Sequence, residues 1–336
     1  MTDTGWHIYR GDGVRHDRID LLPEPPPWRS FDGEVLEPAP ADVPLNAARP
    51  GAEERAANYR ADASVVDMVN AAMYLRRPLL VTGRPGTGKS SLAFSIAWEL
   101  GLGPVLSWPV TSRSQLQQSL YGYDAIGRLQ EANLRRLGQP GPPDTSAGRF
   151  ITLGPLGTAL IARDRPRVLL VDEFDKGDID LPNDLLNVLE EGEFAIPELT
   201  REELDEPVRL FTHDGGSALV PGGRVRCRAF PVIIITSNGE RAFPEAFKRR
   251  CIQVTISEPS PEQLAMIVRT QLGEEPLARA ELVFSRFMSQ RDAGVPVPTD
   301  QLLNAVYLAT AGLDGDAGTR REVALALLSS IGSDDR

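Results

Sequence analysis

The feature that most constrains the fold is the octapeptide Gly-Arg-Pro-Gly-Thr-Gly-Lys-Ser at residues 83–90, which satisfies the pattern G-x-x-x-x-G-K-[ST] in full. An apolar run at residues 78–82 precedes it, and a helical stretch at residues 91–100 follows it. Glycines at such a junction let the backbone turn tightly, so that successive N–H groups point toward one phosphate. The octapeptide therefore predicts a strand, a phosphate-binding loop and a helix in direct succession.

Two side chains at the end of this loop suit a nucleotide that carries a divalent ion. Lys89 can reach the β and γ phosphates, and the Ser90 hydroxyl can hold Mg²⁺. The predicted cofactor-binding residues of this segment are Gly83, Arg84, Pro85, Gly86, Thr87, Gly88, Lys89, Ser90 and Ser91.

A pair of carboxylates, Asp172 and Glu173, follows the apolar run of residues 167–171. We expect Asp172 to join Ser90 in the magnesium shell and Glu173 to polarise the attacking water as general base. Acidic residues also cap helices, so the pair alone does not decide between the two interpretations. Its position after a phosphate-binding loop favours the catalytic one.

Another apolar run, residues 232–236, is followed by Asn238. An amide at this end of a strand can position the attacking water or the γ phosphate. Asparagine is also a common turn residue, and that interpretation stays open for Asn238 taken alone. The two preceding motifs favour a role in catalysis.

The apolar runs predict an α/β fold. They alternate with helical stretches, which is typical of a parallel sheet sandwiched by helices, and a hairpin is expected within residues 208–228. The five strands of the parallel sheet are expected at residues 78–82, 104–108, 167–171, 231–236 and 252–256.

Helical patterns replace strand patterns after residue 256. The stretch Ser260-Pro-Glu-Gln has the form of a capping box, and so has Thr319-Arg-Arg-Glu. We therefore predict a proline-rich arm at residues 1–59, a nucleotide-binding α/β domain at residues 60–257 and a small all-helical lid at residues 258–336.

The predicted arm has eight prolines between residues 23 and 50, which favour extended backbone. Its aromatic side chains are costly to leave in water, so we expect the arm to pack along the next domain, with a flexible leader as the alternative. These aromatic residues are Trp6, Tyr9, Trp28 and Phe31.

Composition disfavours several classes of partner. The chain has 36 Lys and Arg against 47 Asp and Glu, a net charge of −11 that repels phosphate backbones, so nucleic acid is not the expected partner. The first residues do not have the pattern of a secretory leader and no run of 18 apolar residues occurs, so we expect a cytoplasmic protein without a membrane span. Two cysteines, Cys227 and Cys251, are too few for a zinc site.

Together these motifs resemble the AAA+ ATPases and, within them, the MoxR-like branch. Residues 83–90 are similar to Walker A, residues 168–173 to Walker B, and residues 233–238 to the strand that ends in sensor 1. Further elements resemble the branch: Phe-Ile-Thr-Leu-Gly-Pro-Leu at 150–156, Leu-Leu-Asn-Val-Leu-Glu-Glu-Gly at 185–192, and Phe-Pro-Glu-Ala-Phe-Lys-Arg-Arg-Cys at 243–251.

The resemblance implies an ATPase with Lys89, Glu173, Asn238 and an arginine finger, Arg250, as catalytic residues. It implies a homo-oligomeric ring, usually of six subunits, with ATP bound between neighbours and Arg250 entering the adjacent subunit's site. Two departures exist: Asp-Glu-Phe-Asp-Lys at 172–176 replaces the family's D-E-I-N-R, and residues 315–320 stand in place of G-A-S-P-R. Arg320 is then the candidate for sensor 2, with Arg321 as the fallback.

Three functions are compatible with this sequence. The first is a ring-forming remodeller of a protein partner, which in the MoxR-like branch often carries a von Willebrand factor A domain. The second is an ATP-dependent assembly switch or scaffold in a bacterial multi-gene signalling or conflict system. The third is a DNA-acting motor, which the net charge of −11 disfavours.

Overall fold

The computed structural model describes residues 5–37, 52–137, 147–202, 206–273, 275–276, 280–293, 295, 297–310 and 317–329. It separates into two compact units, which are described one at a time. The α/β unit comprises Met1–Val81 and Ser90–Val254, and the helical unit comprises Thr82–Lys89 and Thr255–Arg336. No helix among the described residues is long and apolar enough to cross a membrane.

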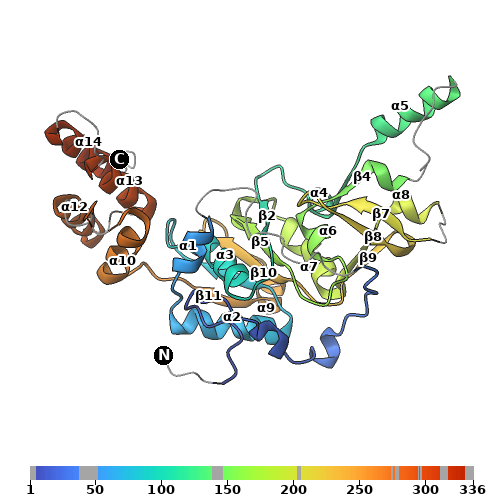
Figure 1. The fold of residues 1–336 in the computed structure, drawn as a ribbon, viewed down its shortest axis with the longest axis horizontal. Coiled ribbons are helices and arrows are strands. Elements are labelled where there is room, and N and C mark those ends of the chain that lie inside the picture. Colours follow the sequence, from blue (N-terminus) through green and yellow to red (C-terminus); the bar gives the residue numbers. More distant parts are fainter. Residues whose placement is uncertain are drawn as a thin grey trace. The chain divides into compact units, whose positions relative to one another are not determined.

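A five-stranded parallel sheet forms the centre of the fold, as predicted (Figure 1). Its strand order is β11-β1-β10-β5-β2. Valine, isoleucine and leucine dominate these strands because helices cover both faces of a parallel sheet and leave little exposed surface. The strands are β1 (Leu79–Thr82), β2 (Leu106–Pro109), β5 (Val168–Asp172), β10 (Val232–Ser237) and β11 (Ile252–Thr255).

The helices of the α/β unit alternate with these strands along the chain. Buried apolar side chains from several of these helices, among them Leu156, Leu185 and Phe247, join those of β2, β5 and β10 in one core. The helices are α1 (Ala52–Asn58), α2 (Ala63–Leu75), α3 (Lys89–Glu99), α4 (Leu116–Leu120), α5 (Ala125–Arg136), α6 (Pro155–Ala159), α7 (Leu181–Glu191), α8 (Pro197–Thr200) and α9 (Glu245–Arg250).

A second, mixed sheet of the α/β unit has the strand order β3-β4-β7-β8. Its β7–β8 pair is antiparallel and confirms the hairpin expected in residues 208–228, while β9 leaves that hairpin and pairs with β6. The strands of this sheet and of the separate β6–β9 pair are β3 (Tyr121–Tyr123), β4 (Ile151–Leu153), β6 (Glu193–Ala195), β7 (Val208–Phe211), β8 (Ser217–Val220) and β9 (Arg224–Arg226).

The described part of the arm, residues 5–37, packs on the α/β unit and, drawn in blue in Figure 1, runs from α2 and α3 to β9. Three of its four aromatic side chains follow the expectation. Tyr9 is fully buried, Phe31 stacks on Phe230, and the Trp6 ring packs edge-on against Tyr74. Trp28 does not, because its side chain is 74% exposed. Its neighbour Arg29 takes the buried position instead, where it binds helix carbonyl groups.

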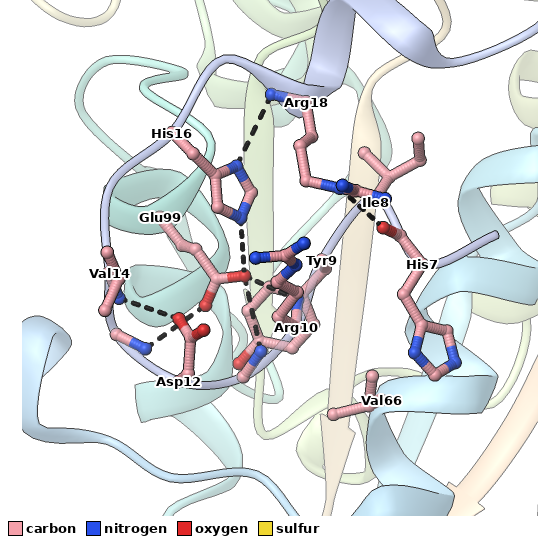
Figure 2. Close-up of polar contacts among 12 residues, drawn as sticks. His7, Ile8, Tyr9, Arg10, Asp12, Val14, His16, Arg18, Val66 and Glu99 are labelled. Carbon is pink, nitrogen blue, oxygen red and sulfur yellow. Dashed lines mark hydrogen bonds and ion pairs between the residues drawn. The ribbon is translucent and has the colours of Figure 1, made fainter. Parts of the chain in front are cut away.

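Polar side chains of α2 and α3 bind the backbone of the arm. Asn70 accepts hydrogen bonds from the Ile8 and Tyr9 amides and donates one to the Tyr9 carbonyl. Figure 2 shows the second anchor, the fully buried Glu99, whose carboxylate accepts backbone hydrogen bonds from residues 10, 11 and 13. Burial raises the pKa of Glu99, whereas the amide donors act in the opposite direction.

The described helices of the helical unit pack around a core that includes Leu264, Phe287, Leu302 and Leu328. The capping box predicted at Ser260 is confirmed, because Ser260 and Gln263 exchange side-chain to backbone hydrogen bonds. The one predicted at Thr319 is wrong: its helix begins at Ala317, so Thr319 lies inside it, whereas an N-cap lies outside. The helices are α10 (Pro261–Leu272), α12 (Glu281–Asp292), α13 (Thr299–Thr310) and α14 (Ala317–Ser329).

The Glu99 anchor generates a first prediction. Glu99→Ala leaves three backbone N–H groups without their acceptor, so the amides of Arg10, Gly11 and Gly13 should exchange hydrogen at least about tenfold faster. Hydrogen exchange followed by mass spectrometry measures this, with Glu24→Ala, an exposed arm residue, as the control. Unchanged exchange at these amides would show that Glu99 does not hold the arm.

Candidate nucleotide site

The carboxyl ends of β5 and β10 bring together polar side chains from three segments of the α/β unit. The register pairs Ile235 with Val171, so the residues that follow them, Thr236 and Asp172, lie side by side at the ends of the two strands. Asp172 Oδ1 accepts hydrogen bonds from Ser90 Oγ and from Thr236 Oγ1, each at 2.7 Å. One carboxylate oxygen therefore joins the start of α3 to both strand ends.

Glu173 has an unusual backbone conformation at this edge. Its φ of 56° and ψ of 47° lie in the left-handed region, which costs a non-glycine residue about 1–2 kcal/mol. The Glu173 amide donates to Thr236 Oγ1 at 2.9 Å, so the hydroxyl that binds Asp172 also satisfies the strained residue. Thr236 is 1% exposed, so water does not compete for these two hydrogen bonds.

The Glu173 carboxylate is paired with a lysine. Lys176 Nζ lies 2.8 Å from Glu173 Oε2; Glu173 precedes the 3-10 helix η4 (Phe174–Lys176), and Lys176 ends it. This hydrogen bond raises the pKa of Lys176. Lys176 occupies the last position of the Asp-Glu-Phe-Asp-Lys departure noted above, so the departure still supplies a cation beside Glu173.

Asp175 belongs to the same departure and organises the loop that carries Asn238. Its buried Oδ2 accepts the backbone N–H groups of Asn238 at 2.9 Å and of Glu240 at 3.0 Å. The Asn238 side chain is half-buried and makes no hydrogen bond with the described residues. The loop is thus fixed through its backbone, which leaves the amide side chain available.

Residues 83–89 of the predicted phosphate-binding loop lie in the helical unit and have the glycine conformations that their sequence requires. Gly86 has a φ of 77°, and a Cβ at this residue would lie 2.8 Å from the Thr299 nitrogen. Lys89, 7% exposed, donates from Nζ to the carbonyl oxygens of Gly83 and Arg84, both at 2.8 Å. These two hydrogen bonds from Lys89 stabilise the turn of the loop.

The remaining predicted residues lie on helices. Ser91 is half-buried in the first turn of α3, and Arg320 is half-buried on α14. Arg250 ends α9, and its Nε lies 2.9 Å from Glu190 Oε1 at the end of α7. The roles proposed for Arg320 and Arg250 stay predictions.

The sequence analysis did not identify Thr236 and Asp175 as site residues. Thr236 ends an otherwise aliphatic run, and Asp175 lies within the Asp-Glu-Phe-Asp-Lys segment, so each had a local signal. Their partners lie on or just after a neighbouring strand, and only the register of β5 and β10 reveals the contacts.

Residues 78–251, just over half of the chain, match the model of a known family, the AAA domain of the dynein-related subfamily. The chain belongs to this family. No curated protein sequence matches it. AAA domains generally hydrolyse ATP and commonly form oligomeric rings. The family assignment confirms the resemblance to AAA+ ATPases, and the MoxR-like branch stays a prediction.

The donor chemistry of this AAA domain fits a magnesium nucleotide. Ser90 and Asp172 offer a hydroxyl and a carboxylate oxygen, and Mg²⁺ is usually held by one or two protein oxygens together with substrate phosphates. A metal site made of protein ligands alone fits less well, because the described residues contain no group of three or more His, Cys, Asp or Glu that could hold a metal ion.

The Thr236 contacts generate a second prediction. Thr236→Val keeps the side-chain size but removes the donor to Asp172 and the acceptor for the Glu173 amide. We expect the ATP turnover number to fall by about 10- to 100-fold, the equivalent of one or two lost hydrogen bonds, with nucleotide affinity changed less than about threefold. Steady-state hydrolysis and equilibrium binding measure both, with the exposed Thr152→Val as control. Wild-type turnover in Thr236→Val would contradict the proposed importance of this network.

Proposed function

We propose that this AAA domain protein is a ring-forming ATPase of the MoxR-like branch that uses ATP hydrolysis to remodel or activate a protein partner. The observation that carries the proposal is the network of Ser90, Asp172, Thr236 and Glu173 at the carboxyl ends of β5 and β10. A merely structural strand end does not require two adjacent carboxylates, one of them on strained backbone. The cytoplasmic location and a von Willebrand factor A partner belong to the proposal as sequence-based predictions.

In this proposal the loop residues 83–91 bind the ATP phosphates, while Ser90 and Asp172 hold Mg²⁺. The ion neutralises phosphate charge when bound. Glu173 accepts a proton from the water that attacks the γ phosphorus as the bond to the bridging oxygen of ADP breaks. Asn238 orients that water, Arg320 contacts the nucleotide from the lid, and Arg250 of an adjacent subunit stabilises the developing charge.

One observation favours the second candidate function, an ATP-dependent assembly switch or scaffold. The Glu173 carboxylate is held by Lys176 at 2.8 Å, and a base engaged in this way suits slow hydrolysis. Both side chains are 40% exposed or more, so the ion pair is weak and does not by itself prevent catalysis. No contact among the described residues favours a DNA-acting motor.

The role of Glu173 generates a third prediction. Glu173→Gln removes the proton acceptor but keeps the shape, so ATP should bind with wild-type affinity while turnover falls at least about 100-fold. Rapid separation of the protein with radiolabelled ATP measures retention. Lys89→Ala should instead lose nucleotide binding. Hydrolysis by Glu173→Gln at the wild-type rate would overturn the assignment of the general base.

The arginine at the end of α9 generates a fourth prediction. Arg250→Ala should leave ATP binding intact and lower turnover about 1,000-fold, which is typical for loss of an arginine supplied in trans. Arg249→Ala is the matched control, because this neighbouring side chain is also exposed and makes no ion pair or hydrogen bond with the described residues. Loss of turnover in Arg249→Ala with normal Arg250→Ala would move the finger by one residue.

A further inference from the structure

The exposed side chain proposed as the finger is held by a carboxylate on another helix. Arg250 Nε lies 2.9 Å from Glu190 Oε1, and the other acceptor that Arg250 reaches in the described part of the chain is the Ala246 carbonyl at 3.4 Å. Arg250 is 47% exposed and Glu190 43% exposed. A long side chain in this setting would otherwise sample many rotamers, so the Glu190 contact limits where the guanidinium lies.

Glu190 is itself held by a buried arginine of the arm. Arg29, 6% exposed, donates to the backbone carbonyls of Leu189 at 3.0 Å and Glu190 at 3.1 Å, at the end of α7. It also donates to the Arg76 carbonyl at 2.6 Å, next to the end of α2. Carbonyl groups at helix ends lack intrahelical partners, and a cation there is favourable. Arg29 therefore ties two helix ends together.

The same guanidinium also faces the Glu190 side chain. Arg29 Nη1 lies 3.6 Å from Glu190 Oε2, the carboxylate oxygen that Arg250 does not use. The guanidinium carbon of Arg29 lies 4.7 Å from the ring centre of Phe230 and 5.1 Å from that of Phe31, so its plane has little freedom. Glu190 is consequently fixed at its backbone and at one oxygen, and it presents the other oxygen to Arg250.

We propose that Glu190 is a positioning residue for Arg250 and that Arg29 of the arm sets the position of Glu190. The inference rests on the proposed function, in which Arg250 serves the adjacent subunit. An arginine held in place before the reaction loses less entropy on reaching the developing charge, so its removal from that place slows turnover without weakening nucleotide binding. The arm thereby contributes to catalysis at a site that it does not touch.

The test mixes two inactive proteins. Arg250→Ala keeps Glu173, and Glu173→Gln keeps Arg250, so a mixed ring regains hydrolysis where the first protein supplies the site and the second supplies the finger. Glu190→Gln introduced into the finger-supplying protein should lower the recovered turnover about tenfold. The same substitution in the site-supplying protein should leave it unchanged, because that protein has no finger to position.

Further variants separate positioning from structural damage. Glu191→Gln in the finger-supplying protein should have no effect, since the Glu191 side chain makes no hydrogen bond or ion pair with the described residues. Arg29→Gln there should lower the recovered turnover as Glu190→Gln does. Every variant should retain wild-type ATP affinity.

The outcomes distinguish the two claims. No recovered hydrolysis in the starting mixture would overturn the finger in trans and this inference with it. Recovery that is insensitive to Glu190→Gln, or equally lowered by it in either protein, would overturn the inference alone. A higher turnover with Glu190→Gln in the finger-supplying protein would also overturn it, because Glu190 would then restrain Arg250.

Discussion

The candidate site depends on one oxygen atom, Oδ1 of Asp172, which accepts hydrogen bonds from Ser90 and Thr236. Those two donors come from the first turn of α3 and from β10, so the oxygen fixes three segments that are far apart in the sequence. Thr236 also accepts a hydrogen bond from the Glu173 amide. This hydrogen bond helps to offset the free energy that the left-handed backbone of Glu173 costs. The proposed magnesium ligands and the proposed base thus share one network.

Much of the α/β architecture could be predicted from the sequence because its signals are local. Runs of aliphatic residues located the five strands, and Ser260 with Gln263 located the start of α10. Thr319 shows the limit of such signals: its pattern fits a capping box, but the helix begins two residues earlier. The second sheet was predicted only in its β7–β8 hairpin, since β3 and β4 are three residues long and pair across distant sequence.

The contacts that depend on neighbours were not predictable. Asp175 and Thr236 acquire their roles from the register of β5 and β10, which no single segment encodes. The arm was expected to pack through aromatic residues, yet its polar anchors are Glu99 and Arg29, and Trp28 stays exposed. Isolated charged residues give no periodic pattern, so the sequence analysis did not identify these two anchors. Arg29 also connects the arm to the end of α7 and, through Glu190, to Arg250.

In the proposed function, hydrolysis requires active sites shared between subunits. Steady-state ATP hydrolysis measured against protein concentration, with mass determined by light scattering in the same samples, tests this requirement. We expect specific activity to rise as the ring assembles, and we expect Glu173→Gln to assemble without activity. Constant specific activity in a protein that remains monomeric at all concentrations would contradict shared sites, and near-zero turnover with tight ATP retention would favour the switch.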